Sequence, residues 1–292
     1  MTFSAYTRNK RAKKGAETTM NSKFSRFPIT WMLAGALGII LIDSLFRPLA
    51  YQAGEVASLA ITFVEGSIAI LVYRLTMKYL ANRPTPELTR QRAGIEAGMG
   101  LVTGVLFILV SILIIVAAGG YTFQWASSAD TSSILASSIT SALGAAFVEE
   151  LIFRGLMFQA ITKLAEPWLA LAVTSLFFGV AHLGNTGATL WSAFAISIEA
   201  GVLLGAAFIW RRNLWFVMGL HFGWNAVEGL LGIPVSGHTT TGLFTVKAEG
   251  AALLTGGTFG LEASIVPVVV SLAIAIPMLM VAKRKQPSFK EI

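Results

Sequence analysis

The sequence predicts an all-α membrane protein, a polytopic bundle of about eight transmembrane helices. Of its 292 residues, 55% are hydrophobic and only 13% are charged. A soluble chain usually carries about 25% charged residues, because its surface must be wetted. Long apolar runs recur along the chain, and the basic residues gather in alternate loops. The chain has no Cys, which excludes disulfides, thiolate metal ligands and thiol nucleophiles.

Apolar runs of membrane-spanning length define the predicted helices. Turn-forming residues separate several of them, such as Pro84 and Pro86 after the second run and Pro167 after the fourth, because proline ends or kinks a helix. The predicted spans are 29–46, 55–80, 95–119, 131–161, 168–184, 190–210, 213–232 and 261–282.

The distribution of Lys and Arg predicts the orientation. Of these 22 residues, only Arg47 and Lys247 fall on one side of the predicted membrane, and Arg154 falls inside a span. The positive-inside rule therefore places both termini in the cytoplasm, which requires an even number of spans. The net charge of +7 is explained by topology and contact with anionic lipid, so we expect no nucleic-acid partner. We expect an integral, multi-pass protein of the cell membrane.

The chain is expected to form one membrane-embedded domain. Residues 1–27 form a basic cytoplasmic tail, without the cleavage site of a removable signal peptide. The helical domain covers 28–284, with its core at about 131–232, and a second tail covers 285–292. The exported loop 233–262 is rich in Gly and Thr, and a re-entrant or short helical piece is expected there.

Glycines at small-xxx-small spacing predict close helix packing. Asp130, which precedes Thr131, is expected to cap the fourth span. The glycine pairs are Gly94/Gly98, Gly100/Gly104, Gly201/Gly205 and Gly219/Gly223.

Ionisable side chains at membrane depth are costly and mark candidate functional sites. The densest group is Glu149, Glu150 and Arg154 in the fourth span. Glu150 and Arg154 are four residues apart, so they share a helix face and are expected to pair. Glu149 is turned about 100° away from Glu150 and is free for another task. A buried ion pair with one additional satisfied Glu is the simpler structural alternative.

Two of the three histidines also fall inside apolar spans. His182 ends the fifth span, and His221 and Asn225 share a face of the seventh. At 1.5 Å per residue, these groups and Glu149 all lie about 12 to 21 Å from the cytoplasmic ends of their helices. We therefore expect them to meet in one cavity near the middle of the membrane.

This set suits the hydrolysis of an amide. Glu149 with a His can hold and deprotonate a water, and His221 and Asn225 can donate to a developing oxyanion. Alternatively, Glu149, His182 and His221 have the ligand count of a catalytic zinc site with an open water position. The sequence contains no G-x-S-x-G or H-E-x-x-H motif, so a serine hydrolase elbow and a zincin are not indicated.

The chain resembles the CPBP family of intramembrane proteases, which includes CAAX prenyl endopeptidases and bacteriocin-processing or immunity proteins. Its motifs E-E-x-x-x-R, F-x-x-x-H and H-x-x-x-N occur once each, in order and on separate predicted spans. They are Glu149-Glu150 with Arg154, Phe178 with His182, and His221 with Asn225. The resemblance covers about 131–232.

The resemblance implies an intramembrane endopeptidase acting on a membrane-associated peptide or protein. It implies that Glu149 and His182 activate the water and that His221 and Asn225 polarise the scissile carbonyl. Glu150 and Arg154 would support the site, and Phe178 would pack one turn before His182. Both a metalloprotease using one divalent metal, such as zinc, and a metal-free glutamate mechanism remain open, as does the choice between a lipidated CAAX-type substrate and a leader peptide.

Two other function classes share part of this pattern. Buried Glu and His residues also relay protons in a proton- or ion-coupled transporter, but the repeated halves and broken helices of many transporters are not evident. A non-catalytic immunity or scaffold protein would not need all four polar groups.

Overall fold

The structure, a computed structural model, describes residues 27–127 and 130–285. Both predicted tails therefore lie almost entirely outside the described residues. The long helices are α2 (Pro28–Gln52), α3 (Glu55–Leu75), α4 (Ala93–Ala117), α5 (Thr131–Glu150), α7 (Pro167–Ala181), α10 (Leu214–Leu231) and α12 (Ile265–Lys285). Shorter helices are α6 (Phe158–Thr162), α8 (Leu190–Ile196), α9 (Leu203–Arg211) and α11 (Ala252–Thr255).

Every predicted span is helical, and the all-α polytopic bundle is confirmed. In the described part of the chain, seven helical segments are long and apolar enough to cross a membrane. The remaining predicted span is α10, whose 18 residues include His221, Asn225 and Glu228. These polar residues lower its mean hydropathy, although the helix itself is almost entirely buried. The protein is therefore an integral multi-pass membrane protein.

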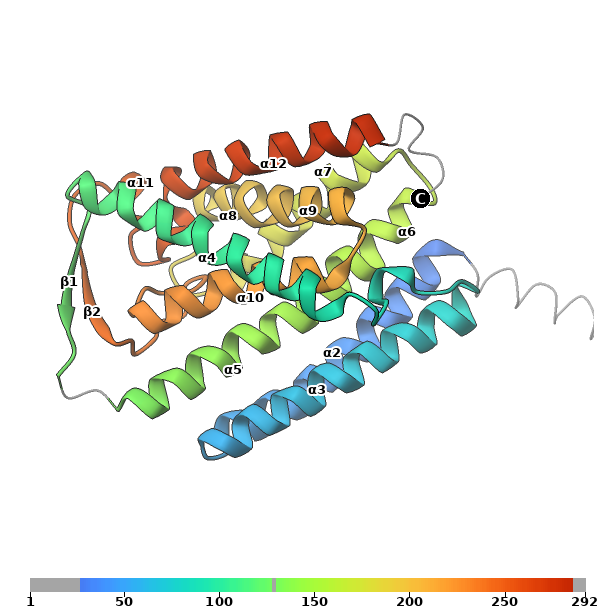
Figure 1. Cartoon of the computed structure of the whole chain (residues 1–292), viewed down its shortest axis with the longest axis horizontal. Helices are drawn as coiled ribbons and strands as arrows, with labels where there is room; N and C mark the ends of the chain where they lie inside the picture. The colour runs from blue at the N-terminus through green and yellow to red at the C-terminus, as the bar shows by residue number, and fades with distance from the viewer. Residues whose placement is uncertain (1–26, 128–129, 286–292) are drawn as a thin grey trace, which may run out of the picture.

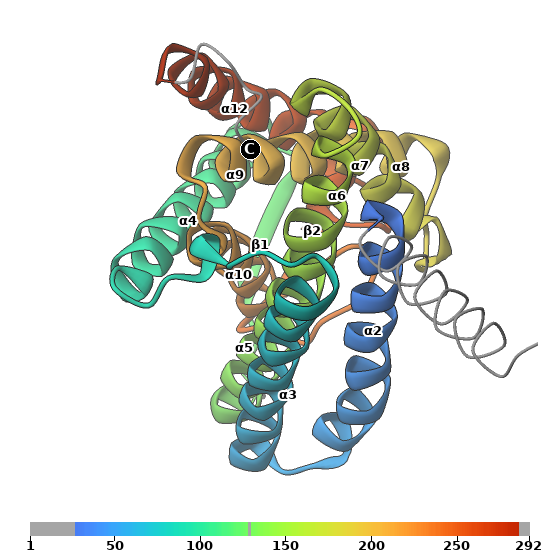
Figure 2. The ribbon, with the colours of Figure 1, turned by 90° about the vertical axis from the view of Figure 1, so that its right-hand side faces the viewer.

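The bundle has a buried centre and a lipid-facing periphery. In the span Leu190–Arg211, 78% of the most apolar window is buried inside the protein, against 17% for α2. Figures 1 and 2 show α2 and α3 as a long hairpin at one side, while α9 runs between α12 and α10. Along α2, Leu33, Leu37, Leu41 and Leu45 are exposed, as expected for side chains that contact lipid.

Three spans contain a π-helical turn, which the apolar pattern does not predict. These are η1 (Thr76–Leu80), η3 (Leu151–Met157) and η5 (Ser197–Val202). A π turn inserts one residue into the α-helical repeat and is frequent at functional sites. Because of η3, the fourth span continues from α5 into α6 with its faces rotated, and this wide turn carries Arg154.

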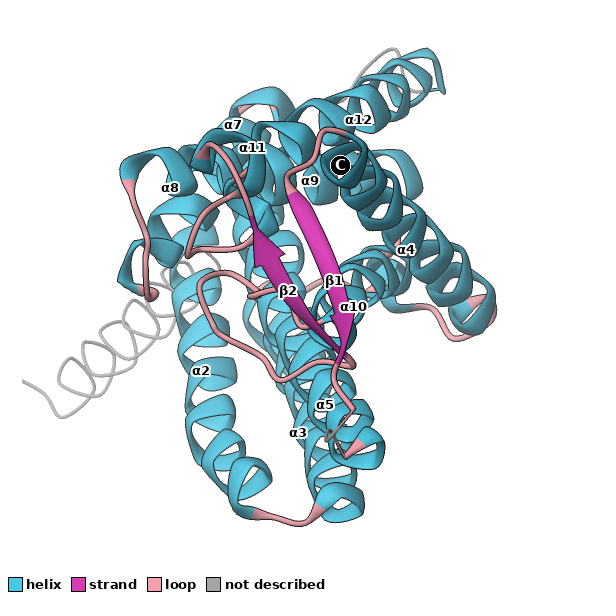
Figure 3. Ribbon diagram, turned by 90° about the vertical axis from the view of Figure 1, so that its left-hand side faces the viewer, coloured by secondary structure: helices cyan, strands magenta, loops and turns pink. Residues whose placement is uncertain are grey.

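A two-stranded antiparallel sheet was not predicted. β1 (Tyr121–Trp125) follows α4, and β2 (Phe244–Ala248) lies within the loop 233–262. Tyr121 pairs with Ala248 and Trp125 with Phe244, so the two loops form a ribbon across one end of the bundle (Figure 3). The same loop contains the predicted short helical piece, as α11 and the 3-10 turn η6 (Leu261–Ala263). It therefore forms ordered structure tied to the α4–α5 connection.

Helices α4 and α10 pack backbone to backbone through four of the predicted glycines. A Cβ atom on Gly100 would lie 2.0 Å from the Phe216 carbonyl oxygen, and one on Gly104 would lie 2.1 Å from the Leu220 carbonyl oxygen. Gly219 and Gly223 on α10 approach α4 in the same way, with such distances of 2.2 and 2.6 Å to carbonyl oxygens. These small residues set how close the helix that carries His221 lies to its neighbour.

Substituting Gly104 with Ala should destabilise the protein by about 1–3 kcal/mol, because the added methyl group would push backbone against backbone. Gly98→Ala on the same helix is the matched control, since no described residue lies within 4 Å of a Cβ atom there. That variant should be neutral or slightly stabilised, because Ala favours helix over Gly. Thermal unfolding of both purified variants in detergent checks the difference. Equal melting temperatures would contradict the close approach of α4 and α10.

Candidate active site

A buried carboxylate at the end of α5 joins two helices. Glu150 Oε1 accepts a hydrogen bond from Arg154 Nη1 at 2.9 Å and contacts His221 Nδ1 at 2.8 Å. The exposed fractions of Glu150, Arg154 and His221 are 0%, 2% and 5%. The Glu150–Arg154 pair is the one that the sequence spacing indicates. The contact with His221, 71 residues away, anchors α10 to the end of α5.

The Arg154 guanidinium also connects two π-helical turns. From its place in η3, its Nη2 donates to the carbonyl oxygens of Ala200 at 2.8 Å and Gly201 at 3.2 Å, both in η5. A fully buried charge is tolerated only when it is paired and hydrogen-bonded. Arg154 meets this condition with one carboxylate and two carbonyls, and so ties the fourth span to the sixth.

The ring of Phe178 gathers side chains from three spans. The His182 ring stacks on it at 4.7 Å between centroids, and the His221 ring meets it edge-on at 6.4 Å. Arg154 Cζ lies 4.9 Å from the centre of the same ring. His182 Nδ1 also contacts the Phe178 carbonyl oxygen at 2.7 Å, across the turn where α7 passes into the 3-10 turn η4 (His182–Gly184). The predicted site residues on α7, η3 and α10 therefore lie around one aromatic ring.

Glu149 is half-buried and differs from its neighbour. It interacts electrostatically with Arg154 and His221. No hydrogen bond links Glu149 to His182 or His221 among the described residues. The structure therefore places Glu149 beside the Glu150–His221 pair, with its carboxylate unused by the fold.

Two polar atoms at this site are buried without a hydrogen-bond partner among the described residues, namely Glu150 Oε2 and Asn225 Oδ1. Asn225 is 8% exposed and lies one helical turn beyond His221 on α10. Buried polar groups are nearly always satisfied, so unsatisfied ones point to a functional role. The Asn225 amide is held next to the site, and the described fold makes no use of its oxygen.

The loop 233–262 contributes a carboxylate that the sequence analysis did not single out. Glu262 in η6 is 2% exposed, accepts a hydrogen bond from Ser236 Oγ at 2.6 Å, and interacts electrostatically with His182 and His221. Burial raises the pKa of Glu262, although Ser236 and the two imidazoles act in the opposite direction. Asn185, just after η4, donates to the Ser236 carbonyl oxygen at 2.9 Å and ties this loop to His182. Only the folded loop brings Glu262 here, and no sequence motif marks it.

Glu199 and Glu228 lie near Glu262 and are both fully buried. Glu228 Oε2 accepts a hydrogen bond from Trp224 Nε1 at 3.1 Å. Neither oxygen of Glu199 has a hydrogen-bond partner among the described residues. A group of acidic side chains thus borders the histidines on the side of the 233–262 loop.

The described residues contain no group of three or more His, Asp or Glu side chains placed to hold a metal ion. The alternative ligand set of Glu149, His182 and His221 therefore finds no support in the geometry.

The fold and this site define a class of protein: a multi-pass membrane protein with a buried Glu–Arg–His assembly that joins two of its spans. Residues 130–227 match the family model described as type II CAAX prenyl endopeptidase Rce1-like. The match covers roughly a third of the chain and contains all three motifs, which confirms the resemblance stated from the sequence. No curated protein and no solved structure matches the chain significantly. The family match supports an intramembrane protease of the CAAX type.

Proposed function

We propose that the protein is an intramembrane endopeptidase that hydrolyses a peptide bond by means of a Glu149- and His182-activated water. The observation that carries this proposal is the assembly of Arg154, His182 and His221 around the Phe178 ring, next to the uncommitted Glu149. Three helices converge there on polar groups that are costly in a membrane, and such groups mark candidate functional sites.

In the proposed reaction, Glu149 takes a proton from a water held with His182. The resulting hydroxide attacks the carbonyl carbon of the scissile bond, and an oxyanion forms. Glu149 then returns the proton to the nitrogen of the leaving amine as the carbon–nitrogen bond breaks. A carboxyl group that acts first as base and then as acid contributes about 10²–10⁴-fold to such a reaction.

His221 and Asn225 are proposed to stabilise the oxyanion. His221 Nδ1 faces Glu150, so a second donor at Nε2 requires the imidazolium form, in which His221 and Arg154 would share the Glu150 carboxylate. The Asn225 amide, one turn away on the same helix, would donate from Nδ2. Arg154 holds Glu150 in place by its bonds to η5, so we propose a supporting role for Glu150, Arg154 and Phe178.

We propose that the substrate carries a lipidated C-terminal cysteine motif of the CAAX type, and the family match supports this choice. The buried site and the exposed leucines of α2 favour a substrate that is itself anchored in the bilayer. We propose that the protein lies in the cell membrane and that the lipid of this membrane is its non-protein partner.

The test uses purified protein in liposomes and three synthetic peptides. These are a prenylated CAAX peptide, the same peptide without the prenyl group, and a leader-type peptide of equal length. We expect mass spectrometry to detect cleavage of the prenylated peptide and little of the other two. Preferential cleavage of the leader peptide would overturn the substrate class, and cleavage of none would overturn the proteolytic function.

A further inference from the structure

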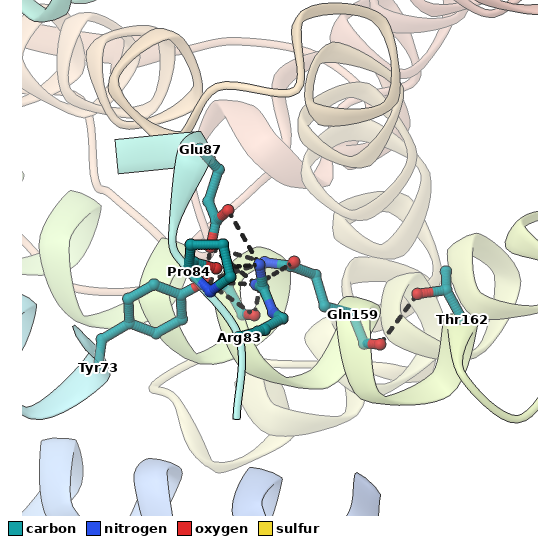
Figure 4. A network of polar contacts seen from close by, with 7 residues as sticks. Tyr73, Arg83, Pro84, Glu87, Gln159 and Thr162 are labelled. Atoms are coloured by element: carbon teal, nitrogen blue, oxygen red, sulfur yellow. Dashed lines mark hydrogen bonds and ion pairs between the residues drawn. The ribbon is translucent and has the colours of Figure 1, made fainter. Parts of the chain in front are cut away.

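A polar network lies at the end of the bundle where η1 leads into the α3–α4 loop. We define the Arg83 network as Tyr73 of α3, Arg83 and Glu87 of that loop, and Gln159 of α6 (Figure 4). Arg83 donates hydrogen bonds from both terminal nitrogens to the Glu87 carboxylate, from Nη2 to Oε1 at 2.8 Å and from Nη1 to Oε2 at 3.3 Å. Tyr73 Oη donates to Glu87, and Arg83 donates to the Gln159 side-chain oxygen. Gln159 Nε2 in turn donates to Tyr73 Oη at 2.9 Å.

The Arg83 network is largely buried, and hydrogen bonds hold its side chains in place. Tyr73 is 0% exposed and Glu87 is 4% exposed. Arg83 also donates to the Pro84 carbonyl oxygen at 2.8 Å. Burial by itself lowers the pKa of Arg83, but the hydrogen bond to Glu87 and the adjacent Tyr73 offset this effect and raise its pKa above the ordinary value. Arg83 is therefore a cation that its hydrogen bonds hold in one position.

Two members of the network converge on Gly155, the residue that follows Arg154 in η3. Gln159 Nε2 donates to the Gly155 carbonyl oxygen at 2.8 Å, and Tyr73 Oη lies 3.4 Å from the same oxygen. The Tyr73 ring packs so closely that a Cβ atom on Gly155 would lie 2.8 Å from it. The network thus holds the wide turn of η3 by one hydrogen bond, from Gln159, and by the packing of the Tyr73 ring.

The same turn also contacts the candidate active site. Within η3, Arg154 reaches across to Glu150 and to the η5 carbonyls, and Glu150 meets His221 Nδ1. A π turn is less favourable than a regular α-helix and persists where surrounding contacts determine it. If η3 relaxed to α-helical geometry, the direction of Arg154 relative to α5 would change, and the Glu150–His221 contact with it.

We propose that the Arg83 network is the positioning device of the site: by clamping Gly155 it holds η3 in its wide turn, and so fixes Arg154, Glu150 and His221. This inference rests on the proposed function for its effect on turnover. Tyr73, Arg83, Glu87 and Gln159 act as positioning residues, since they reach the reacting groups only through η3.

The structure offers a matched control. The ion pair between Arg211 and Glu96 joins α9 to α4, with the two side chains 23% and 7% exposed. Arg83 and Glu87 are 22% and 5% exposed, so the two pairs are buried to nearly the same extent. The Arg211–Glu96 pair makes no hydrogen bond to η3 among the described residues. The experiment compares Glu87→Gln with Glu96→Gln, and adds Tyr73→Phe, which keeps the ring on Gly155 and removes only the hydroxyl group.

Two readouts are taken on full-length protein below its melting temperature. The first is steady-state cleavage of the prenylated peptide. We expect Glu87→Gln to lower kcat by about 10- to 100-fold, since a small misplacement of reacting groups is costly. We expect Tyr73→Phe to lower kcat as well, with KM unchanged in both variants and with Glu96→Gln like wild type. The second is the ¹⁵N NMR signal of the His221 ring, which reports its bond to Glu150 whether or not the protein cleaves peptides.

The two readouts separate this inference from the proposed function. A changed His221 signal in Glu87→Gln and Tyr73→Phe, but not in Glu96→Gln, supports the positioning role even if wild-type protein cleaves nothing. An unchanged His221 signal in Glu87→Gln and Tyr73→Phe overturns it. Where wild type does cleave, a kcat that is equal in Glu87→Gln and Glu96→Gln also overturns it.

Discussion

Replacing Glu149 with Gln should lower peptide cleavage by about 10²–10⁴-fold and leave the fold intact. Glu149 is half-buried, and in the described part of the chain it makes no hydrogen bond to either site histidine, so the exchange of a carboxylate for an amide removes little stability. An amide cannot take a proton from water, and the loss of a general base lowers turnover by about 10²–10⁴-fold. The measurement is kcat/KM for the prenylated peptide, with the melting temperature recorded beside it.

The control for this prediction is Glu166→Gln, which alters an exposed carboxylate just before α7. It should cleave like wild type. His182→Gln should lose as much activity as Glu149→Gln, and the double variant should lose little more, because residues that act as one unit are strongly non-additive. Wild-type turnover by Glu149→Gln would exclude it as the base.

Replacing Arg154 with Met should destabilise the protein by about 3–5 kcal/mol, because it leaves the buried Glu150 carboxylate without its cation. The variant also frees the η5 carbonyls of Ala200 and Gly201 in a dry interior. We expect reversible unfolding in detergent, followed by Trp fluorescence, to show the loss.

Arg47→Met provides the comparison. Arg47 and Asp43 form an ion pair with the same four-residue spacing and a distance of 2.7 Å, but Arg47 is 62% exposed. An exposed pair of this kind contributes about 0–1 kcal/mol. Similar losses in the two variants would show that Glu150 and Arg154 are not held in a dry interior.

Much of the architecture was predictable, since lipid imposes apolar runs of a set length and since pairs such as Glu150 and Arg154 depend only on helix periodicity. The close contacts of Gly100 and Gly104 with α10 were also predictable from spacing. Gly94 and Gly98 have the same spacing, but among the described residues nothing lies within 4 Å of a Cβ atom built on either of them. The spacing alone does not tell which face of a helix meets a partner.

The rest depends on contacts that no local pattern encodes. The bond from His221 to Glu150 joins residues 71 positions apart. The π turn η3 rotates the face of the fourth span after Glu150, so a single helical wheel cannot describe that span. β1 and β2 are each only five residues long and pair across more than a hundred intervening residues. Glu262 comes close to the two histidines only when the loop 233–262 is folded.

The glycine contacts between α4 and α10 have a consequence for how a peptide enters. Because the two backbones are in direct contact, no layer of side chains separates these helices, and they should move as one rigid unit. His221 and Asn225 belong to this unit. Room for a polypeptide must therefore come from displacement of the other elements around the histidines, and rigid cross-linking of α4 to α10 should leave turnover unaffected.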